Sequence, residues 1–167
     1  TYLDAQGKQQ QEHQIFNQIL KLIDEAQTTI VLDMFLFNDE VGSSKISHDK
    51  LTQNLAEALI VKKRMTPQIE IKVITDPINS VYGGIAPEHY RLLRQAGIEV
   101  IETDLTPLRA SNPMWSGFWY LCCQGVGNNA EKGWLPNPFG DEKITLRSYL
   151  SLFNFKANHR KTVVVDT

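Results

Sequence analysis

The chain has 167 residues, of which 42% are hydrophobic and 22% are charged, enough for one well-cored globular domain and too few for two of typical size. Its formal net charge of -2 excludes a global basic field that could hold a nucleic-acid backbone, which counts against a nuclease. No apolar run reaches the roughly 18 residues that are needed to cross a bilayer.

The sequence leaves the cellular compartment open. Its N-terminus, TYLDAQGKQQQEHQ, begins with Thr rather than Met and has no basic region followed by an apolar stretch, so it does not match a secretory signal. The only cysteines, Cys122 and Cys123, are adjacent and cannot link distant parts of a fold, so we interpret them as small buried hydrophobic residues. We expect the chain to be a piece of a longer protein.

Amphipathic and apolar segments alternate in the first half of the chain. A helix is predicted over residues 10–26, because five apolar residues recur on one helical stripe: Ile15, Phe16, Ile19, Leu20 and Ile23. The nearly continuous apolar run of residues 28–37 predicts a strand that is covered on both faces, as in a parallel sheet.

The same alternation continues to residue 102. The predicted elements are, in order, a helix over residues 48–65, a strand over 69–75, a helix over 87–95 and a strand over 98–102. Pro67 ends the first of these helices, Pro87 suits the first position of the next, and Gly97 suits its C-terminal cap. Alternating helices and strands predict an α/β fold with a mostly parallel sheet.

Polar residues follow the predicted strands, where parallel sheets collect their functional groups. Asp39, Asp76 and Asp104 lie at or just past strand ends, but their spacing matches no metal site. We interpret them as loop and cap residues. The histidines outside the C-terminal motif have no partner at ligand spacing and are given no role: His13, His48 and His89.

Residues 105–147 form a long insertion that is rich in proline, glycine and aromatic residues. Its most apolar cluster comprises Met114, Trp115, Phe118, Trp119, Tyr120 and Leu121. Trp and Tyr favour membrane–water boundaries, so one interpretation is that the insertion lines a lipid entry, with Trp115 and Trp119 in contact with substrate, or rests on a membrane. The other interpretation is a helix that packs this stripe onto the sheet.

Near the C-terminus, His159, Lys161 and Asp166 follow the spacing His-x-Lys-x4-Asp in the sequence NHRKTVVVD. The β-branched run of residues 162–165 predicts a buried terminal strand of the parallel sheet, on which side chains alternate between faces. His159 and Lys161, two residues apart, are therefore expected to project together. An imidazole beside an ammonium suits phosphate chemistry, because the lysine neutralises phosphate oxygens while the histidine attacks phosphorus or moves a proton.

NHRKTVVVD resembles the signature of the phospholipase D superfamily, in which Asn commonly precedes the motif and a hydrophobic strand follows it. Three further segments are similar to that family's catalytic half, in the family's order: ILKLIDEAQTTIVLDMFLFND, IEIKVITDPINSVYGG and LLRQAGIEVIETD. Together they cover nearly the whole chain. The resemblance implies one phospholipase D-like half-domain over residues 1–167, with helices flanking a mostly parallel sheet and an aromatic-rich insertion over 105–147.

The resemblance also implies a chemistry. His159 would attack phosphorus to give a phosphohistidine, Lys161 would bind the phosphate oxygens, and Asp166 would support the hydrogen bonding and charge of the site. Asn158, directly before the motif, would contact the substrate. The substrate would be a phospholipid that is hydrolysed or transferred to an alcohol, as in cardiolipin synthesis, and the mechanism requires no metal or cofactor. Membrane association of the parent protein is expected.

The family uses a second histidine to protonate the leaving group, and this chain carries a single motif. We expect the partner to be a second motif half of the same protein, in preference to a symmetric copy, and residues 1–167 alone to be inactive or feeble. One alternative is a nuclease of the same superfamily, for which the aromatic insertion with few charges is unsuited. The other is a non-catalytic domain that keeps the fold for binding or assembly.

Overall fold

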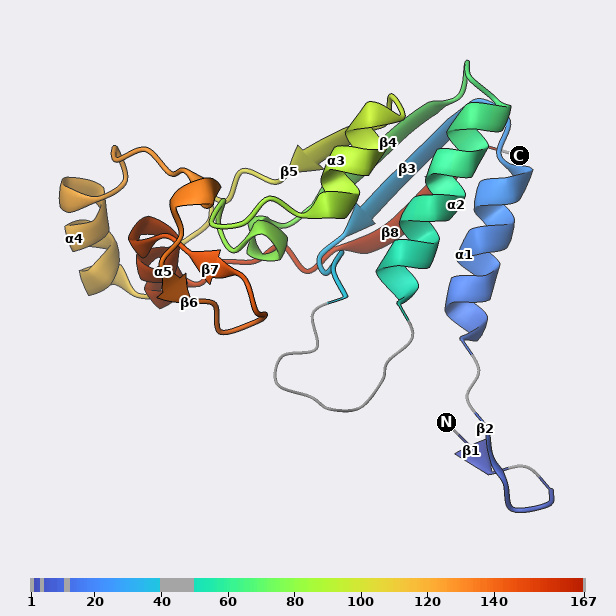
Figure 1. The fold of residues 1–167 in the computed structure, drawn as a ribbon, viewed down its shortest axis with the longest axis horizontal. Helices are drawn as coiled ribbons and strands as arrows, with labels where there is room; N and C mark the ends of the chain where they lie inside the picture. Colours follow the sequence, from blue (N-terminus) through green and yellow to red (C-terminus); the bar gives the residue numbers. More distant parts are fainter. Residues whose placement is uncertain (1, 4, 11–12, 40–49, 167) are drawn as a thin grey trace.

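The computed structural model describes residues 2–3, 5–10, 13–39 and 50–166, and its centre is a four-stranded sheet (Figure 1). The strands lie in the order β5-β4-β3-β8, with bounds β3 Thr29–Met34, β4 Glu70–Thr75, β5 Glu99–Glu102 and β8 Lys161–Val165. β3, β4 and β5 are parallel, whereas β8 is antiparallel to β3. The predicted α/β class with a mostly parallel sheet is confirmed.

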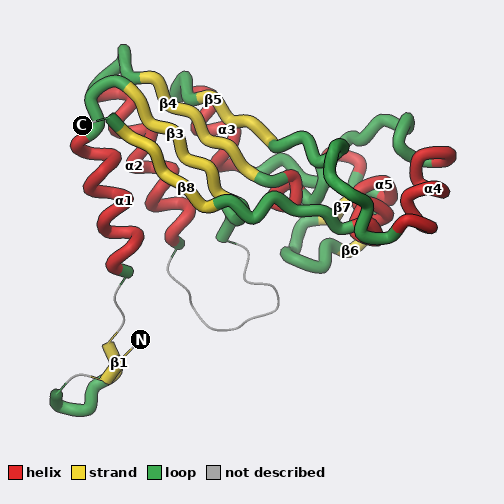
Figure 2. The backbone as a smooth tube through the Cα atoms, turned by 180° about the vertical axis from the view of Figure 1, so that it is seen from behind, coloured by secondary structure: helices red, strands yellow, loops and turns green. Residues whose placement is uncertain are grey.

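One face of the sheet carries the helices α1 Gln14–Glu25, α2 Leu51–Met65 and α3 Glu88–Gln95 (Figure 1). Seen from behind, the strands lie in front of these helices, and no helix of the described chain crosses in front of them (Figure 2). Ile30 and Leu32 on the helix side of β3 are fully buried, while Val31 between them stays partly exposed. The prediction that this strand is covered on both faces is therefore wrong for the described residues, because all three helices pack on the same side.

The observed ends of the elements differ from prediction by a few residues. The start predicted for the second helix, at His48, lies outside the described residues, and α2 is described from Leu51. Pro87 occupies the N-cap of α3 rather than its first turn. Gly97 has a φ of 80° and donates its N–H to Arg94 O, as predicted for a C-terminal cap.

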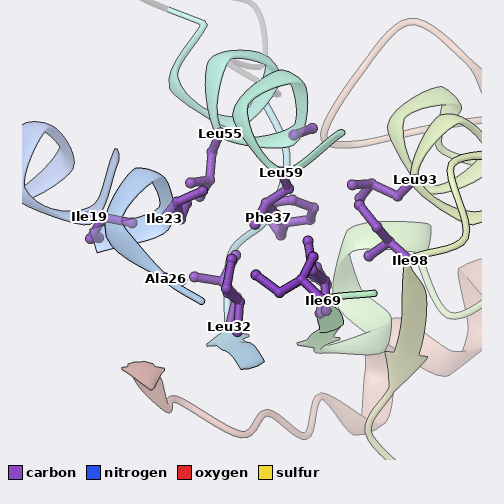
Figure 3. Close-up of a cluster of buried hydrophobic side chains, with 14 of the residues drawn as sticks. Ile19, Ile23, Ala26, Leu32, Phe37, Leu55, Leu59, Ile69, Leu93 and Ile98 are labelled. Atoms are coloured by element: carbon purple, nitrogen blue, oxygen red, sulfur yellow. The ribbon is translucent and has the colours of Figure 1, made fainter. Parts of the chain in front are cut away.

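The main core lies between the helices and the sheet (Figure 3). It is built from apolar residues at helical and strand spacing, including Ile23 of α1, Leu55 and Leu59 of α2, Leu93 of α3, and Leu32 and Val73 of the strands. Each side chain of this size that is fully buried contributes about 1.5–3 kcal/mol to folding. The sheet edge that carries the polar residues is thus supported by a packed layer.

A smaller lobe lies beyond the carboxyl ends of the parallel strands (Figures 1 and 2). Its elements are α4 Pro113–Cys122, η2 Ala130–Lys132, β6 Leu135–Pro136, β7 Lys143–Ile144, α5 Leu146–Ser151 and η3 Leu152–Asn154. Its own core joins Ile144 to Val81 and Ile85, which follow β4 and the short helix η1 Pro77–Ser80. A separate two-stranded pair, β1 Tyr2–Leu3 with β2 Gln9–Gln10, precedes α1.

Two interpretations of the insertion are corrected by this lobe. α4 packs against α5 and η3, so the prediction that it lays its aromatic stripe on the sheet is wrong. Cys122 and Cys123 are joined to each other by a disulfide at the end of α4, and Cys122 is exposed, so they are not buried hydrophobic residues. α4 ends at Cys122, and the chain leaves the helix at Cys123.

Replacing Leu59 by Ala should lower the free energy of unfolding by about 2–5 kcal/mol, because this fully buried side chain would leave a cavity between α2 and the sheet. Urea unfolding followed by circular dichroism measures the loss. Val61→Ala is the matched control on the same helix, since Val61 is 51% exposed, and it should change stability by less than about 0.5 kcal/mol. Equal losses would contradict the placement of the core.

Candidate active site

The motif strand runs in the direction opposite to the one expected from the sequence. Lys161 pairs with Met34, at the carboxyl end of β3, and Phe35 N donates to Arg160 O at 2.9 Å. The physical reason is the route of the chain, which enters β8 from the lobe at the carboxyl edge and must run back along β3. β8 is also an edge strand rather than a buried one, since Val164 is 59% exposed. Because β8 runs in this reversed direction, the start of the motif lies at the carboxyl ends of the parallel strands, where such sheets collect functional groups.

His159 and Lys161 converge on one aromatic ring. The His159 imidazole lies with its centroid 4.2 Å from the centroid of Phe35, tilted by 36°, and Lys161 Nζ lies 5.6 Å from the same centroid. Lys161 Nζ also donates to His159 O at 3.4 Å. Both side chains are exposed. The imidazole and the ammonium therefore share one open surface that an anion can approach.

The segment leading into the motif is fixed by Asp76, the residue after β4. Its Oδ2 accepts from Asn158 N at 2.8 Å, while its Oδ1 accepts from Ile78 N at 2.9 Å and caps η1. Asp76 is almost completely buried. A buried carboxylate that accepts two backbone amides holds both segments at a defined separation, so Asp76 positions the residue before His159.

Asn79 links the ends of β3 and β4 at the same edge. Its Oδ1 accepts from Phe37 N at 2.9 Å, and its Nδ2 donates to Phe35 O at 2.7 Å and to Thr75 Oγ1 at 2.8 Å. The side chain is buried, so these groups would lack partners without it. Asn79 thereby holds the backbone of Phe35, and the ring of Phe35 contacts the His159 imidazole.

The turn after η1 also holds the segment that leads into the motif, residues 156–158, which we call the approach segment. Val81 and Tyr82 have φ values of 48° and 53°, a conformation that non-glycine residues rarely adopt. This turn directs the Tyr82 hydroxyl at Lys156, where it donates to the carbonyl at 3.1 Å and accepts from the amide at 3.4 Å. Burial raises the pKa of Tyr82 to about 12, so the hydroxyl keeps its proton and its donor role.

Asn158 and Arg160 flank His159, and Arg160 links Asn158 to Asp33. Arg160 Nε lies 2.9 Å from Asp33 Oδ2, and Asp33 is buried in β3. With its amide oxygen turned toward Arg160, Asn158 accepts from that guanidinium at 2.8 and 2.9 Å. Asn158 thus donates its backbone N–H to Asp76 and accepts from Arg160 with its side chain. Both contacts fix the loop around His159.

Asp166 lies at the other end of β8, roughly 17 Å along the strand from Lys161. Its carboxylate accepts from Thr29 N at 2.6 Å, from Thr28 N at 2.9 and 3.0 Å, and from Thr28 Oγ1 at 2.5 Å. These hydrogen bonds lower the pKa of Asp166 to about 2. The expectation that Asp166 joins His159 and Lys161 is corrected: Asp166 fastens β8 to the start of β3.

The two candidate tryptophans of the insertion have different surroundings. Trp115 packs edge-on against Phe153 and donates Nε1–H to Leu150 O at 3.2 Å, so it anchors α4 to the lobe. Trp119 lines a cavity of about 350 Å³ between the end of β5 and the lobe, together with Asp104, Tyr120, Arg147 and Lys156. The structure does not bring Trp115 to the motif, and it places Trp119 beside the approach segment through Lys156.

The remaining polar candidates have structural partners. Asp39 accepts from the first amides of α2, Thr52 N at 2.9 Å and Gln53 N at 3.0 Å, and Asp104 accepts from Thr106 N at 2.8 Å. The prediction that these aspartates are loop and cap residues is confirmed. His89 Nε2 lies 2.8 Å from Phe37 O, and burial lowers the pKa of its imidazole. Within the described ranges, no group of three or more His, Cys, Asp or Glu could hold a metal ion.

Sequence reasoning missed the residues that support the motif. Phe35 was part of an apolar run, and nothing in that run distinguishes a residue that carries an imidazole from a core residue. Asn79 lies in a turn with no motif around it. Asp76 had a usable signal, because it ends a predicted strand and precedes Pro77, but its contact with Asn158 depends on the tertiary fold.

No protein-family model, no curated protein and no solved structure matches this chain.

We predict that the stability of the fold decreases in acid because of the Asp166 carboxylate. A group whose folded pKa of about 2 lies below its ordinary 3.8 stabilises the protein above pH 4, and this stabilisation is lost as the pH falls from about 5 toward 2. In Asp166→Asn the free energy of unfolding should be lower at pH 7 and should fall less steeply between pH 5 and 3. Urea unfolding at each pH measures both effects, and Asp24→Asn, an exposed carboxylate of α1, should behave as the wild type.

Asp76→Asn tests the clamp on the approach segment. The substitution keeps the shape but turns an NH2 group toward one of the two amides that Asp76 accepts, so stability should fall by about 1–3 kcal/mol. Asp104→Asn is the matched control at the next strand end, where the carboxylate is exposed and the effect should be smaller. Thermal unfolding ranks the two variants, and an equal or reversed ranking would contradict this role of Asp76.

Proposed function

We propose that this chain is a phospholipase D-like half-domain that supplies one half of a phosphodiesterase or phosphatidyltransferase site acting on phospholipids. The observation that carries the proposal is the pairing of His159 and Lys161 on Phe35 at the carboxyl edge of the sheet. A nucleophilic imidazole next to a fixed cation is the minimum needed to attack a phosphodiester and stabilise the charge that develops.

In the proposed reaction a His159 ring nitrogen attacks phosphorus, and the bond to the leaving alcohol breaks to give a phosphohistidine. Lys161 binds the non-bridging oxygens, and the alkoxide takes a proton from a second imidazole. Water or another alcohol then attacks phosphorus, breaks the P–N bond and returns a proton to that second imidazole. No step requires a metal ion or another cofactor.

The open setting of His159 supports the half-site part of this proposal. His159 and Lys161 are exposed, and neither lines the cavity next to Lys156. Efficient phosphoryl transfer needs a surface that closes over the reacting phosphorus and excludes water. We infer that a second motif half, from the same protein or from a symmetric copy, supplies this cover together with the missing acid.

His159→Ala should abolish turnover, with a loss of at least about a thousandfold, when the longest reading frame that contains this chain is supplied with phosphatidylglycerol, phosphatidylcholine or DNA in separate assays. The unchanged protein should also yield a phosphohistidine, stable in alkali and lost in acid, when it is quenched with labelled lipid. Lys161→Met should weaken turnover without removing the nucleophile.

His13→Ala, at the start of α1, is the matched control and should keep full activity. Turnover of DNA without turnover of lipid would replace the lipid assignment by the nuclease. No turnover and no phosphohistidine with any of the three substrates would favour a non-catalytic domain.

A further inference from the structure

α4 presents an apolar stripe to solvent at the end of the molecule. Met114 and Leu121 are each 90% exposed, and Phe118 between them is 55% exposed. Their spacing of four and three residues puts them on one face of the helix. We call these three residues the α4 stripe. An apolar face this exposed is uncommon on a soluble surface and marks a contact with another phase or molecule.

The opposite face of α4 fixes the stripe in its outward orientation. Trp115 donates to Leu150 O and packs on Phe153, and the side chain of Asn112 caps the first turn by accepting from Trp115 N at 3.2 Å. Ser116 on the same inner face is buried. The helix cannot rotate to hide the stripe without breaking these contacts, so its exposure is a property of the folded lobe.

The distribution of charge around the α4 stripe helps to decide whether a protein or a lipid bilayer covers it. Residues 110–130 contain no Asp, Glu, Lys, Arg or His. Protein interfaces surround an apolar centre with a polar rim, whereas charged groups are excluded from the hydrocarbon of a bilayer by a high cost in free energy. Tyr120, 48% exposed on the flank of the stripe, is of the type that settles at the membrane–water boundary.

A hollow beside the end of α4 adds a second, independent feature. It is lined by apolar groups such as Val126, Leu146 and Leu150 and by two cations, Lys132 and Arg147, and no Asp or Glu is among its described lining residues. An apolar wall next to cations complements a phospholipid, which carries a phosphate above its acyl chains. The stripe and the hollow lie at the same end of the lobe, since Cys122 and Cys123 at the end of α4 line the hollow.

We propose that the lobe docks on a lipid bilayer, with the α4 stripe in the interface and lipid phosphates at the hollow. None of the described helices is long and apolar enough to span a membrane, and an interfacial helix needs no span. The lobe lies past the carboxyl edge of the sheet, so docking brings that edge toward the lipid (Figure 1). This proposal does not depend on the chemistry of His159.

The test compares the chain with the triple variant Met114→Ser, Phe118→Ser, Leu121→Ser in vesicle cosedimentation. We expect the unchanged chain to partition onto vesicles of phosphatidylcholine, and more strongly when phosphatidylglycerol is added. The triple variant should partition at least about a hundredfold more weakly onto both, because it loses the buried apolar area. Lys132→Gln should remove part of the gain from phosphatidylglycerol and leave the binding to phosphatidylcholine unchanged.

The matched control is the triple variant Ile15→Ser, Val61→Ser, Met65→Ser, which removes three apolar residues that are each more than half exposed from α1 and α2 and should bind as the unchanged chain does. Near-ultraviolet circular dichroism checks that both variants fold. Undiminished vesicle binding by the stripe variant would overturn the proposal, as would a concentration-dependent dimer that only the stripe variant loses. His159→Ala should bind vesicles normally, which separates this result from the proposed catalysis.

Discussion

The antiparallel pairing of β8 with β3 is held at each end by a different carboxylate, and each carboxylate accepts hydrogen bonds from backbone amides. At one end Asp166 holds the amides of Thr28 and Thr29, and at the other Asp76 holds the amide of Asn158. Between these points the register leaves Lys161 opposite Met34, one residue before Phe35. A slip by one residue would turn every side chain of β8 to the other face and separate Lys161 from the ring that it shares with His159.

The same pairing explains why the lobe and the motif meet. The chain leaves β5 at the carboxyl edge, builds the lobe there, and returns into β8 from that edge. Tyr82 contacts the returning segment at Lys156, and the turn that carries Tyr82 belongs to the core of the lobe through Val81. The orientation of α4 and the position of His159 are therefore set by one connected framework.

Much of the sheet could be predicted from the sequence, because β3, β4 and β5 are rich in β-branched and apolar residues and are separated by helical segments whose ends are marked by Pro67, Pro87 and Gly97. The direction of β8 could not, since a run of valines has the same pattern in either direction and only the route through the lobe decides it. His159 and Lys161 were identified by spacing that survives this reversal. The motif spacing suggests that Asp166 lies near His159 and Lys161, but the strand that the sequence predicts between Lys161 and Asp166 already holds the two apart.

The bond between Asp166 and Thr28 spans 138 residues of sequence, whereas the contacts of β3 with β4 and of β4 with β5 join neighbouring units. Closing so long a loop costs chain entropy that local units do not incur, so β8 should dock after β3, β4 and β5 have paired. His159 and Lys161 then meet on Phe35 only after β8 has docked. A chain in which β8 has not yet paired with β3, or has come loose from it, would carry the motif without bringing its imidazole and ammonium together.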